Sequence, residues 1–189
     1  MDRIKLLEEL GAIKRGHFLL TSGLHSDTYI EKFRLFEHPH MLFKFIEEDL
    51  NKIAGLGFDA VIGPQLGGAF VACSVASLLK KVAIYVEKDA VGDFYIGRGF
   101  KIEGKKLLLV DDVLTTGSSI KKILKLLDKR AEVSGIYVLV DRREKKTDNF
   151  MGIPLISGTW FNAIVYEPDK CPLCKKKIPL TTKKTDIIK

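Results

Sequence analysis

The chain has 189 residues, of which 46% are hydrophobic and 29% are charged. This length and composition predict one soluble globular domain and exclude disordered, collagen-like and disulfide-dense proteins. The formal net charge is +7, but seven lysines and Asp186 give residues 170–189 a local +6, which leaves +1 for residues 1–169. We therefore interpret the basic segment as a solvated end and expect no nucleic-acid partner, with an RNA-binding or acidic-partner arm as the alternative.

The cysteines and the N-terminal segment indicate a cellular compartment. Cys73, Cys171 and Cys174 are too few for a disulfide framework, which favours a reducing environment. The start MDRIKLLEELGAIK carries charges throughout, and no stretch approaches the ~18 apolar residues that a membrane span needs. We expect a cytoplasmic protein without membrane association.

Helical spacing of apolar residues predicts one helix over residues 2–14 and another over 38–54. Between them, FLLTSGLHSDTYIEKF mixes apolar triplets with serine, glycine and aspartate. This pattern is typical of small strands or of an irregular segment. We expect it to form a small hood over a ligand.

From Asp59 onward, short runs of valine, isoleucine and leucine alternate with helix-length segments. Such runs suit strands that are buried on both faces, and the alternation predicts an α/β fold with a parallel sheet flanked by helices. Residues 88–101 interrupt the pattern with interior glycines and mixed polarity. They predict a mobile loop or a hairpin ribbon.

The strongest functional signal lies in residues 105–127, KKLLLVDDVLTTGSSIKKILKLL. Leu107 to Val110 predict a buried strand, and the apolar spacing after Ser119 predicts a helix. Residues 111–119 would then be the turn between them. Ligands of open α/β sheets bind at the carboxyl ends of strands, and a helix N-terminus attracts anions.

The residue types in this turn suit a ribose 5-phosphate. Residues 115–119, TTGSS, offer small side chains, hydroxyls and a closely approachable backbone, which together predict a phosphate cradle. Asp111 and Asp112 could accept hydrogen bonds from two vicinal sugar hydroxyls. The alternative is that the aspartates merely end the strand and Ser118 caps a helix.

The run LLLVDDVLTTGSS closely resembles the signature of the type I phosphoribosyltransferases. The resemblance implies their fold, a parallel sheet flanked by helices with a small N-terminal hood, in one domain with a hood at 1–37, a core at 38–166 and a basic tail at 167–189. It also implies that the two acids hold the ribose hydroxyls and that the loop holds the 5-phosphate. The motif lacks the Gly-Lys-Ser/Thr ending of a Walker loop, which disfavours an ATPase.

Other segments resemble the orotate branch of this family. Residues 11–31 are similar to its hood, residues 61–70 (VIGPQLGGAF) to its diphosphate-binding turn, and VLVDRREK places Arg142 where an arginine meets the orotate carboxylate. The sequence departs from the family pattern at four positions. Many members have lysine where this chain has Thr21, tyrosine and lysine at Leu66 and Gly67, and arginine at Glu87.

The resemblance implies transfer of the phosphoribosyl group from 5-phosphoribosyl 1-diphosphate to orotate, giving orotidine 5-phosphate and diphosphate in pyrimidine (UMP) synthesis. It further implies Mg²⁺ carried by the ribosyl diphosphate, and a homodimer with shared active sites. Two alternatives remain open: transfer to a purine or another base, and a non-catalytic regulator that senses the phosphoribosyl ligand.

The residues implied as catalytic are Lys88, Asp111 and Asp112. The residues implied as substrate-binding are Tyr29, Ile30, Lys88, Arg98, Asp111, Asp112, Val113, Leu114, Thr115, Thr116, Gly117, Ser118, Ser119 and Arg142.

One C-x-x-C pair, Cys171 and Cys174, lies in the basic tail. Such a pair supplies half of a zinc site. The four histidines, at positions 17, 25, 38 and 40, lie far away in the sequence and show no ligand spacing. A metal or redox role therefore stays open beside a plain turn.

Overall fold

The structure is a computed structural model that describes residues 2–20 and 22–182. Thr21 and residues 183–189 of the tail lie outside the described residues. The chain divides into two compact units, Met1–Arg34 with Asn162–Lys189, and Leu35–Phe161. Within the described ranges, no helix is both long and apolar enough to cross a membrane.

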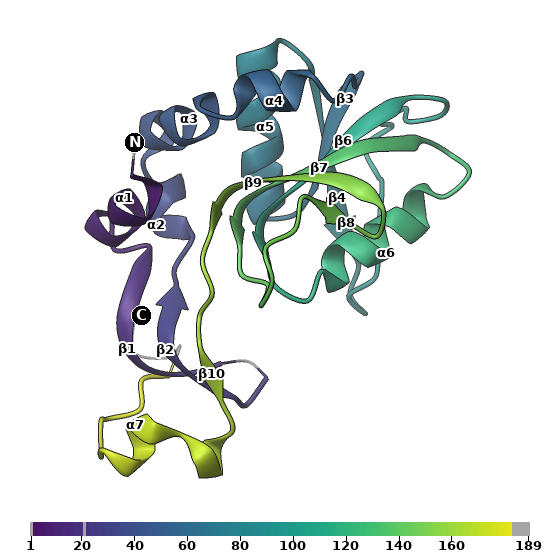
Figure 1. The fold of residues 1–189 in the computed structure, drawn as a ribbon. Helices are drawn as coiled ribbons and strands as arrows, with labels where there is room; N and C mark the ends of the chain where they lie inside the picture. The colour runs from purple at the N-terminus through teal and green to yellow at the C-terminus, as the bar shows by residue number, and fades with distance from the viewer. Residues whose placement is uncertain (1, 21, 183–189) are drawn as a thin grey trace. The chain divides into compact units, whose positions relative to one another are not determined.

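The larger unit contains a seven-stranded sheet with the order β5-β4-β3-β6-β7-β9-β8 (Figure 1). The five inner strands pair in parallel, whereas β5 and β8 pair antiparallel at the two edges. The predicted parallel sheet is confirmed, and residues 88–101 contain a short hairpin partner of β4. The strands are β3 (Ala60–Pro64), β4 (Val82–Lys88), β5 (Phe94–Tyr95), β6 (Lys106–Leu114), β7 (Glu132–Asp141), β8 (Asn149–Phe150) and β9 (Ile153–Trp160).

Helices of the larger unit cover its sheet. They are α3 (Pro39–Glu47), α4 (Leu50–Ala54), α5 (Gly67–Leu79) and α6 (Ser118–Leu127). The connection from β3 through α5 leads to β4, and the connection from β6 through α6 leads to β7 in the opposite direction along the sheet. Because such crossovers are right-handed, α5 and α6 lie on opposite faces (Figure 1).

The direction of the strand order reverses between β3 and β6, and this is where open α/β sheets bind ligands. Pairing of β3 with β6 ends at Ile62↔Leu109, whereas pairing of β7 with β6 continues to Leu114↔Asp141. The end of β6 therefore extends beyond its pairing with β3. The expected turn at residues 111–119 is shorter than predicted, because β7 keeps supplying hydrogen-bond partners and the strand runs through Leu114.

The smaller unit holds a three-stranded antiparallel sheet with the order β1-β2-β10. Its strands join the N-terminal hairpin to a segment near the C-terminus. The helix α2 (Phe33–Phe36) spans the sequence boundary between the units. The elements are α1 (Arg3–Glu9), β1 (Ile13–Leu19), β2 (His25–Ile30), β10 (Val165–Tyr166), the 3₁₀ turn η1 (Pro168–Lys170) and α7 (Pro172–Lys175).

Both predicted N-terminal helices differ from the structure. The helix expected over residues 2–14 ends at Glu9, because Gly11 adopts the left-handed conformation with φ 69° and Ile13 begins β1. The helix expected over 38–54 is divided into α3 and α4. The interruption includes Asp49, a residue type whose side chain competes with helical backbone hydrogen bonds.

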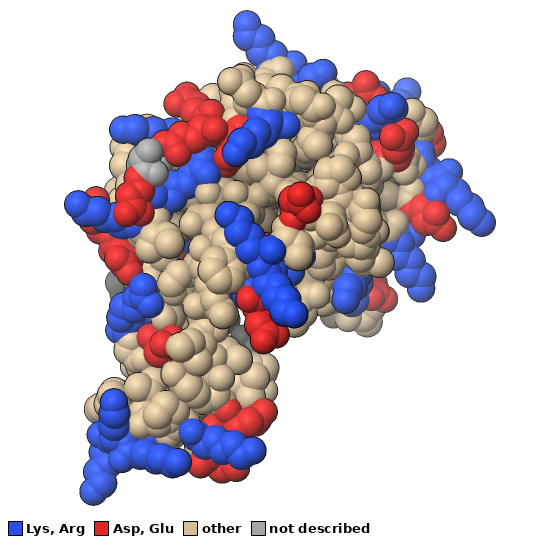
Figure 2. All heavy atoms as spheres, in the orientation of Figure 1, with Lys and Arg blue, Asp and Glu red and all other residues tan. Residues whose placement is uncertain are grey.

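Charged side chains of both signs are interspersed over the face of the molecule that Figure 2 shows. A regulator that binds nucleic acid would need a continuous basic surface for the phosphate backbone. The face in Figure 2 gives no support to that alternative.

Candidate functional site

Two adjacent carboxylates occupy the part of β6 that extends beyond its pairing with β3. Asp111 and Asp112 are buried, with 9% and 5% of their surfaces exposed. The Asp112 backbone N–H donates to Asp111 Oδ1 at 2.9 Å, and the Val113 N–H donates to Asp112 Oδ1 at 2.6 Å. These backbone hydrogen bonds orient both carboxylates. Buried acids at a switch point of the sheet suit the recognition of ligand hydroxyls.

Gly67, at the start of α5, lies directly against the Asp112 carboxylate. A Cβ atom at this position would collide with Asp112 Oδ2 and come within 2.5 Å of its Cγ. A lysine, which many family members carry here, would therefore require the Asp112 side chain to move. The departure from the family pattern at Gly67 thus has a local reason, which is close packing between the β3–α5 turn and β6.

The turn after β6 forms a cradle at the N-terminus of α6. Thr115, Thr116 and Ser118 are exposed, whereas Gly117 is buried. Gly117 has φ 71°, and a Cβ atom there would lie 2.7 Å from Phe150 Cε2. Both the backbone conformation and the ring of Phe150 therefore require glycine. The exposed hydroxyls and the free N–H groups of the first helical turn suit a phosphate group.

Lys88, the last residue of β4, is exposed, and its Nζ lies 4.9 Å from the centroid of the Phe94 ring. Phe94 is the residue that pairs with Lys88 across the β4–β5 hairpin. In the sheet, β3 separates β4 from β6. The backbone nitrogen of Gln65 in the β3–α5 turn donates to Val86 of β4 at 2.8 Å, so this turn is tied to β4.

Arg98 is held by Glu87, a pairing that was not predicted from the sequence. Arg98 Nη2 lies 2.8 Å from Glu87 Oε1, and Arg98 Nε lies 3.3 Å from the same oxygen. The hydrogen bond from Arg98 is the largest cause that lowers the pKa of the Glu87 carboxyl. The same hydrogen bond raises the pKa of Arg98. Burial, followed by the hydrogen bond to Glu87, raises the pKa of Tyr95.

Two consecutive arginines after β7 have different environments. Arg143 binds the fully buried Asp141 through Nε and Nη2, with its shortest N···O distance at 2.8 Å, and also donates to the Thr147 carbonyl at 3.0 Å. Arg142 is half-buried, and its backbone N–H donates to the Leu114 carbonyl at 2.7 Å. Arg143 therefore supports the fold, and the backbone of Arg142 lies beside the end of the aspartate strand.

Tyr29 and Ile30, the residues expected near the base, lie at the end of β2 in the smaller unit. Tyr29 pairs with Lys14 and Ile30 with Ile13 across the hairpin. The Tyr29 ring lies 5.7 Å from the ring of Phe18, measured between centroids. Both residues are half-buried.

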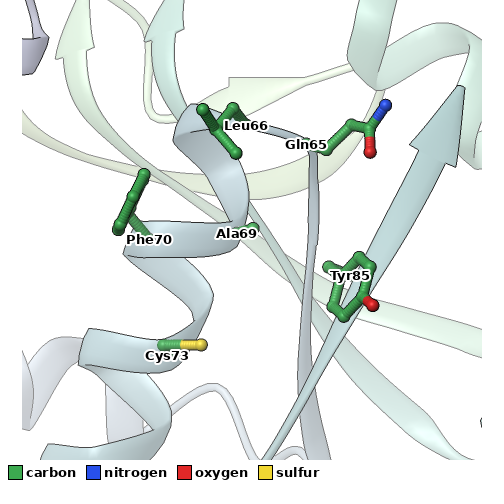
Figure 3. A pocket seen from close by; sticks show the side chains of 6 residues that line it. All are labelled: Gln65, Leu66, Ala69, Phe70, Cys73 and Tyr85. Atoms are coloured by element: carbon green, nitrogen blue, oxygen red, sulfur yellow. The ribbon is translucent and has the colours of Figure 1, made fainter.

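An apolar pocket lies between the start of α5 and β4 (Figure 3). Leu66, Phe70 and Cys73 line it from the helix side, and Tyr85 lines it from β4. Leu66 and Phe70 are exposed at 60% and 44%. Apolar side chains make up most of this lining, which suits an apolar group better than a phosphate.

Residues 111–119 and the backbone of Arg142 are brought together by the pairing of β6 with β7. Lys88 and Arg98 lie at the other side of β3, on the β4–β5 hairpin and the loop after it. Sequence reasoning missed the Glu87–Arg98 pair and the contact of Gly67 with Asp112. The glycine at position 67, where many family members have lysine, could have indicated that this position is closely packed. The acid at position 87, where arginine is common, could have indicated that a nearby cation pairs with it.

Comparisons with known proteins agree with this geometry. The family profile of the phosphoribosyl transferase domain matches residues 35–168. The orotate phosphoribosyltransferase of Caldanaerobacter subterraneus subsp. tengcongensis is 38% identical over 179 residues, which cover 94% of this chain and 93% of that protein. The orotate phosphoribosyltransferase of a Thermoanaerobacter species is 40% identical over the same shares. The crystal structure of the Aeropyrum pernix orotate phosphoribosyltransferase matches with a TM-score of 0.68 at 31% identity, covering 82% of this chain and 92% of that one. The phosphoribosyltransferase fold expected from the sequence is confirmed.

Proposed function

This chain belongs to the phosphoribosyl transferase family, and we propose from that membership that it is an orotate phosphoribosyltransferase. It transfers the phosphoribosyl group of 5-phosphoribosyl 1-diphosphate to orotate and releases diphosphate. The product is orotidine 5-phosphate, an intermediate of pyrimidine biosynthesis. Similarity to orotate phosphoribosyltransferases over nearly the whole chain supports orotate as the base.

The observation that carries the proposal is the position of the two buried aspartates directly before the glycine turn at the switch point. Asp111 and Asp112 would accept hydrogen bonds from the ribose hydroxyls. The backbone N–H groups and hydroxyls of residues 115–119 would hold the 5-phosphate at the start of α6. Val113 and Leu114 connect the two contacts within one strand end, so the spacing of acids and cradle is fixed by β6.

In the reaction, a bond forms between N1 of orotate and the anomeric carbon of ribose, while the bond from that carbon to the diphosphate oxygen breaks. The N1 proton leaves, and diphosphate departs with the bonding electron pair. Positive charge grows on the ribose ring and negative charge on the diphosphate in the transition state. Groups that are already in place for these charges stabilise the transition state more than the ground state.

Mg²⁺ binds oxygen ligands, and in enzymes these are often one or two protein carboxylates together with the phosphates of the substrate. Asp111 and Asp112 are buried carboxylates at the switch point, so the residues present fit a magnesium ion carried by the ribosyl diphosphate. When bound, the ion would supply positive charge at the diphosphate. The aspartates would orient the ribose, and they need no nucleophilic role.

Lys88 and Arg98 are the cations proposed to act on the leaving diphosphate. Lys88 lies at the end of β4, and Arg98 lies in the loop after β5. Because Glu87 holds Arg98 in this structure, Arg98 would have to exchange that carboxylate for a phosphate oxygen in order to act. Such an exchange would keep the guanidinium paired in both states.

Orotate differs from uracil and the purines by its carboxylate, and a planar guanidinium is a suitable donor to it. We assign this role to Arg142. Tyr29 and Ile30 are proposed to contact the base from the hood. A homodimer with shared sites and a cytoplasmic location are implied by family resemblance, and size-exclusion chromatography with light scattering would test the homodimer.

The test of the proposed function is an assay with purified protein, ribosyl diphosphate and Mg²⁺, in which orotate, uracil, adenine and hypoxanthine are compared as acceptors. We expect nucleotide formation with orotate and at least ~100-fold lower kcat/KM for the others, because bases without a carboxylate would leave Arg142 without an anionic partner. Preference for a purine or for uracil would contradict the orotate assignment. No turnover with any base, together with binding of ribosyl diphosphate, would favour a ligand-sensing regulator.

A further inference from the structure

Four potential metal ligands from the two ends of the chain converge in the smaller unit. They are His17 on β1, His25 at the start of β2, and Cys171 and Cys174, which lie three residues apart around the first turn of α7. Their ligand atoms all lie within 4.8 Å of one another. Two of the histidines that lie far from the cysteine pair in the sequence therefore lie beside it in the structure. The pairing of β1 with β2 brings the two histidines together, and the C-terminal segment places the two cysteines beside them.

Three nitrogen–sulfur distances in the cluster match those between neighbouring ligands of a tetrahedral ion. Zinc bonds of about 2.0–2.1 Å to nitrogen and about 2.3 Å to sulfur place neighbouring ligand atoms of a tetrahedron roughly 3.3–3.8 Å apart. His17 Nε2 lies 3.5 Å from Cys171 Sγ and 3.7 Å from Cys174 Sγ, and His25 Nδ1 lies 3.3 Å from Cys174 Sγ. The two histidine nitrogens are 2.9 Å apart, so a bound ion would require them to separate slightly.

The orientation of His17 leaves a lone pair for an ion. His17 Nδ1 lies 2.8 Å from the carbonyl oxygen of Ile178, which can only accept a hydrogen bond, so Nδ1 carries the proton. In the neutral ring, Nε2 is then unprotonated and faces the two cysteines and His25. The Ile178 backbone N–H in turn donates to Leu173, between the two cysteines, at 3.0 Å. Outer hydrogen bonds of this kind fix the tautomer of metal-binding histidines.

Three of the four residues are buried and Cys174 is exposed, so the cluster lies at the edge of the unit. His17, His25 and Cys171 are 2%, 6% and 0% exposed. Such residues could be buried simply as a hydrogen-bonded core, or the two cysteines could form a disulfide as a redox pair. Both sulfur atoms, however, lie within 3.7 Å of the same histidine nitrogen, which is the arrangement of ligands around one centre.

We propose that His17, His25, Cys171 and Cys174 bind one structural Zn²⁺ ion. Two thiolates and two imidazoles in a tetrahedral set are typical of zinc, and four protein ligands leave no open position for a substrate. The ion cross-links β1 and β2 to a segment that lies 149 to 157 residues away in the sequence. The described residues of this unit form a three-stranded sheet and short helices. Small units of this kind depend on metals or other cross-links for stability.

The first experiment measures metal in the full-length protein after dialysis, by inductively coupled plasma mass spectrometry. We expect about one zinc per chain in the wild type and less than about a tenth of that in Cys171→Ser and His25→Ala, because each variant removes one of four ligands. Cys73→Ser and His40→Ala are matched controls, since Cys73 is an exposed thiol and His40 an exposed imidazole of the larger unit. Both controls should keep the full zinc content.

A second measurement does not depend on the folding of the variants. Co²⁺ exchanged into the wild-type protein should give the intense visible absorption of a tetrahedral thiolate site. A chelator that removes the metal should lower the Tm of the wild type and of Cys73→Ser. Absence of stoichiometric metal, zinc that persists in Cys171→Ser, or a Cys171–Cys174 disulfide found by mass spectrometry in protein purified under reducing conditions would each overturn the proposal.

Discussion

The backbone N–H of Arg142 donates a 2.7 Å hydrogen bond to the carbonyl oxygen of Leu114, which ties the arginine after β7 to the end of the strand that carries Asp111 and Asp112. The residue proposed to bind the base and the residues proposed to bind the ribose therefore share one rigid pair of parallel strands. Arg143, the next residue, is committed to the buried Asp141. The two arginines should consequently respond differently to substitution.

Replacing Arg142 with alanine should weaken orotate binding by about 2–5 kcal/mol, the range for removing one partner of a buried charge pair. Binding of the ribosyl diphosphate should stay nearly unchanged, because its contacts lie on residues 111–119. Isothermal titration of both ligands against the wild type and the variant would measure the two effects. An unaltered orotate affinity would contradict the role of Arg142.

Replacing Arg143 with alanine should instead destabilise the fold. The change leaves the Asp141 carboxylate, which is 0% exposed, without its bidentate partner, and the expected loss in the free energy of unfolding is roughly 3–5 kcal/mol. Urea denaturation of Arg143→Ala and Arg142→Ala would compare the two positions. A larger stability loss at Arg142 than at Arg143 would be inconsistent with the contacts in the structure.

The double variant Asp111→Asn, Asp112→Asn should lose turnover, by about 100-fold or more, if the pair positions the ribose of the transition state. Asparagine keeps the shape of each side chain and a carbonyl acceptor for the hydrogen bonds from Asp112 N–H and Val113 N–H. The Tm should therefore fall only slightly. Steady-state kinetics with a thermal melt would separate the two quantities, and near-normal turnover would refute the site assignment.

Replacing Lys88 with alanine should lower kcat far more than it weakens orotate binding, because its proposed contact is with the diphosphate as negative charge develops there. Lys80→Ala provides a matched surface control. Lys80 is the C-cap residue of α5, in the left-handed conformation, and it is not among the residues proposed to bind a substrate. Single-turnover kinetics alongside orotate titration would distinguish rate from binding. Equal losses in both would argue for a general binding role.

The ion pair between Glu87 and Arg98 should make part of the stability depend on pH. Because Arg98 lowers the pKa of Glu87 below its ordinary value of 4.5, the pair stabilises the folded state above pH 4.5, and this contribution is lost as the pH falls through the lowered pKa. The Tm difference between the wild type and Glu87→Gln should be constant near neutral pH and shrink in acid. Calorimetry from pH 7 to pH 3 would test this, and a difference that grows in acid would have the wrong sign.

The sequence by itself determined the chemistry that is local in the chain. Strand, aspartate pair, glycine turn and helix follow one another within residues 105–127, so their order specifies a ribose-phosphate site without knowledge of distant contacts. Continuous apolar runs likewise determined the parallel sheet, since such strands must be buried on both faces. The length of β6 was underestimated, because its last residues are stabilised by pairing with β7, which depends on register.

Only the tertiary structure decided which distant side chains meet. Glu87 holds Arg98 because β4 and β5 form a hairpin, and Gly67 packs on Asp112 because the turn after β3 lies beside the end of β6. His17 and Cys171 are 154 residues apart in the sequence, but His17 Nε2 lies 3.5 Å from Cys171 Sγ. Sequence spacing identifies metal ligands that lie on one helix, strand or loop. This site is instead assembled by strand pairing and by the return of the C-terminal segment, and local sequence patterns do not encode that topology.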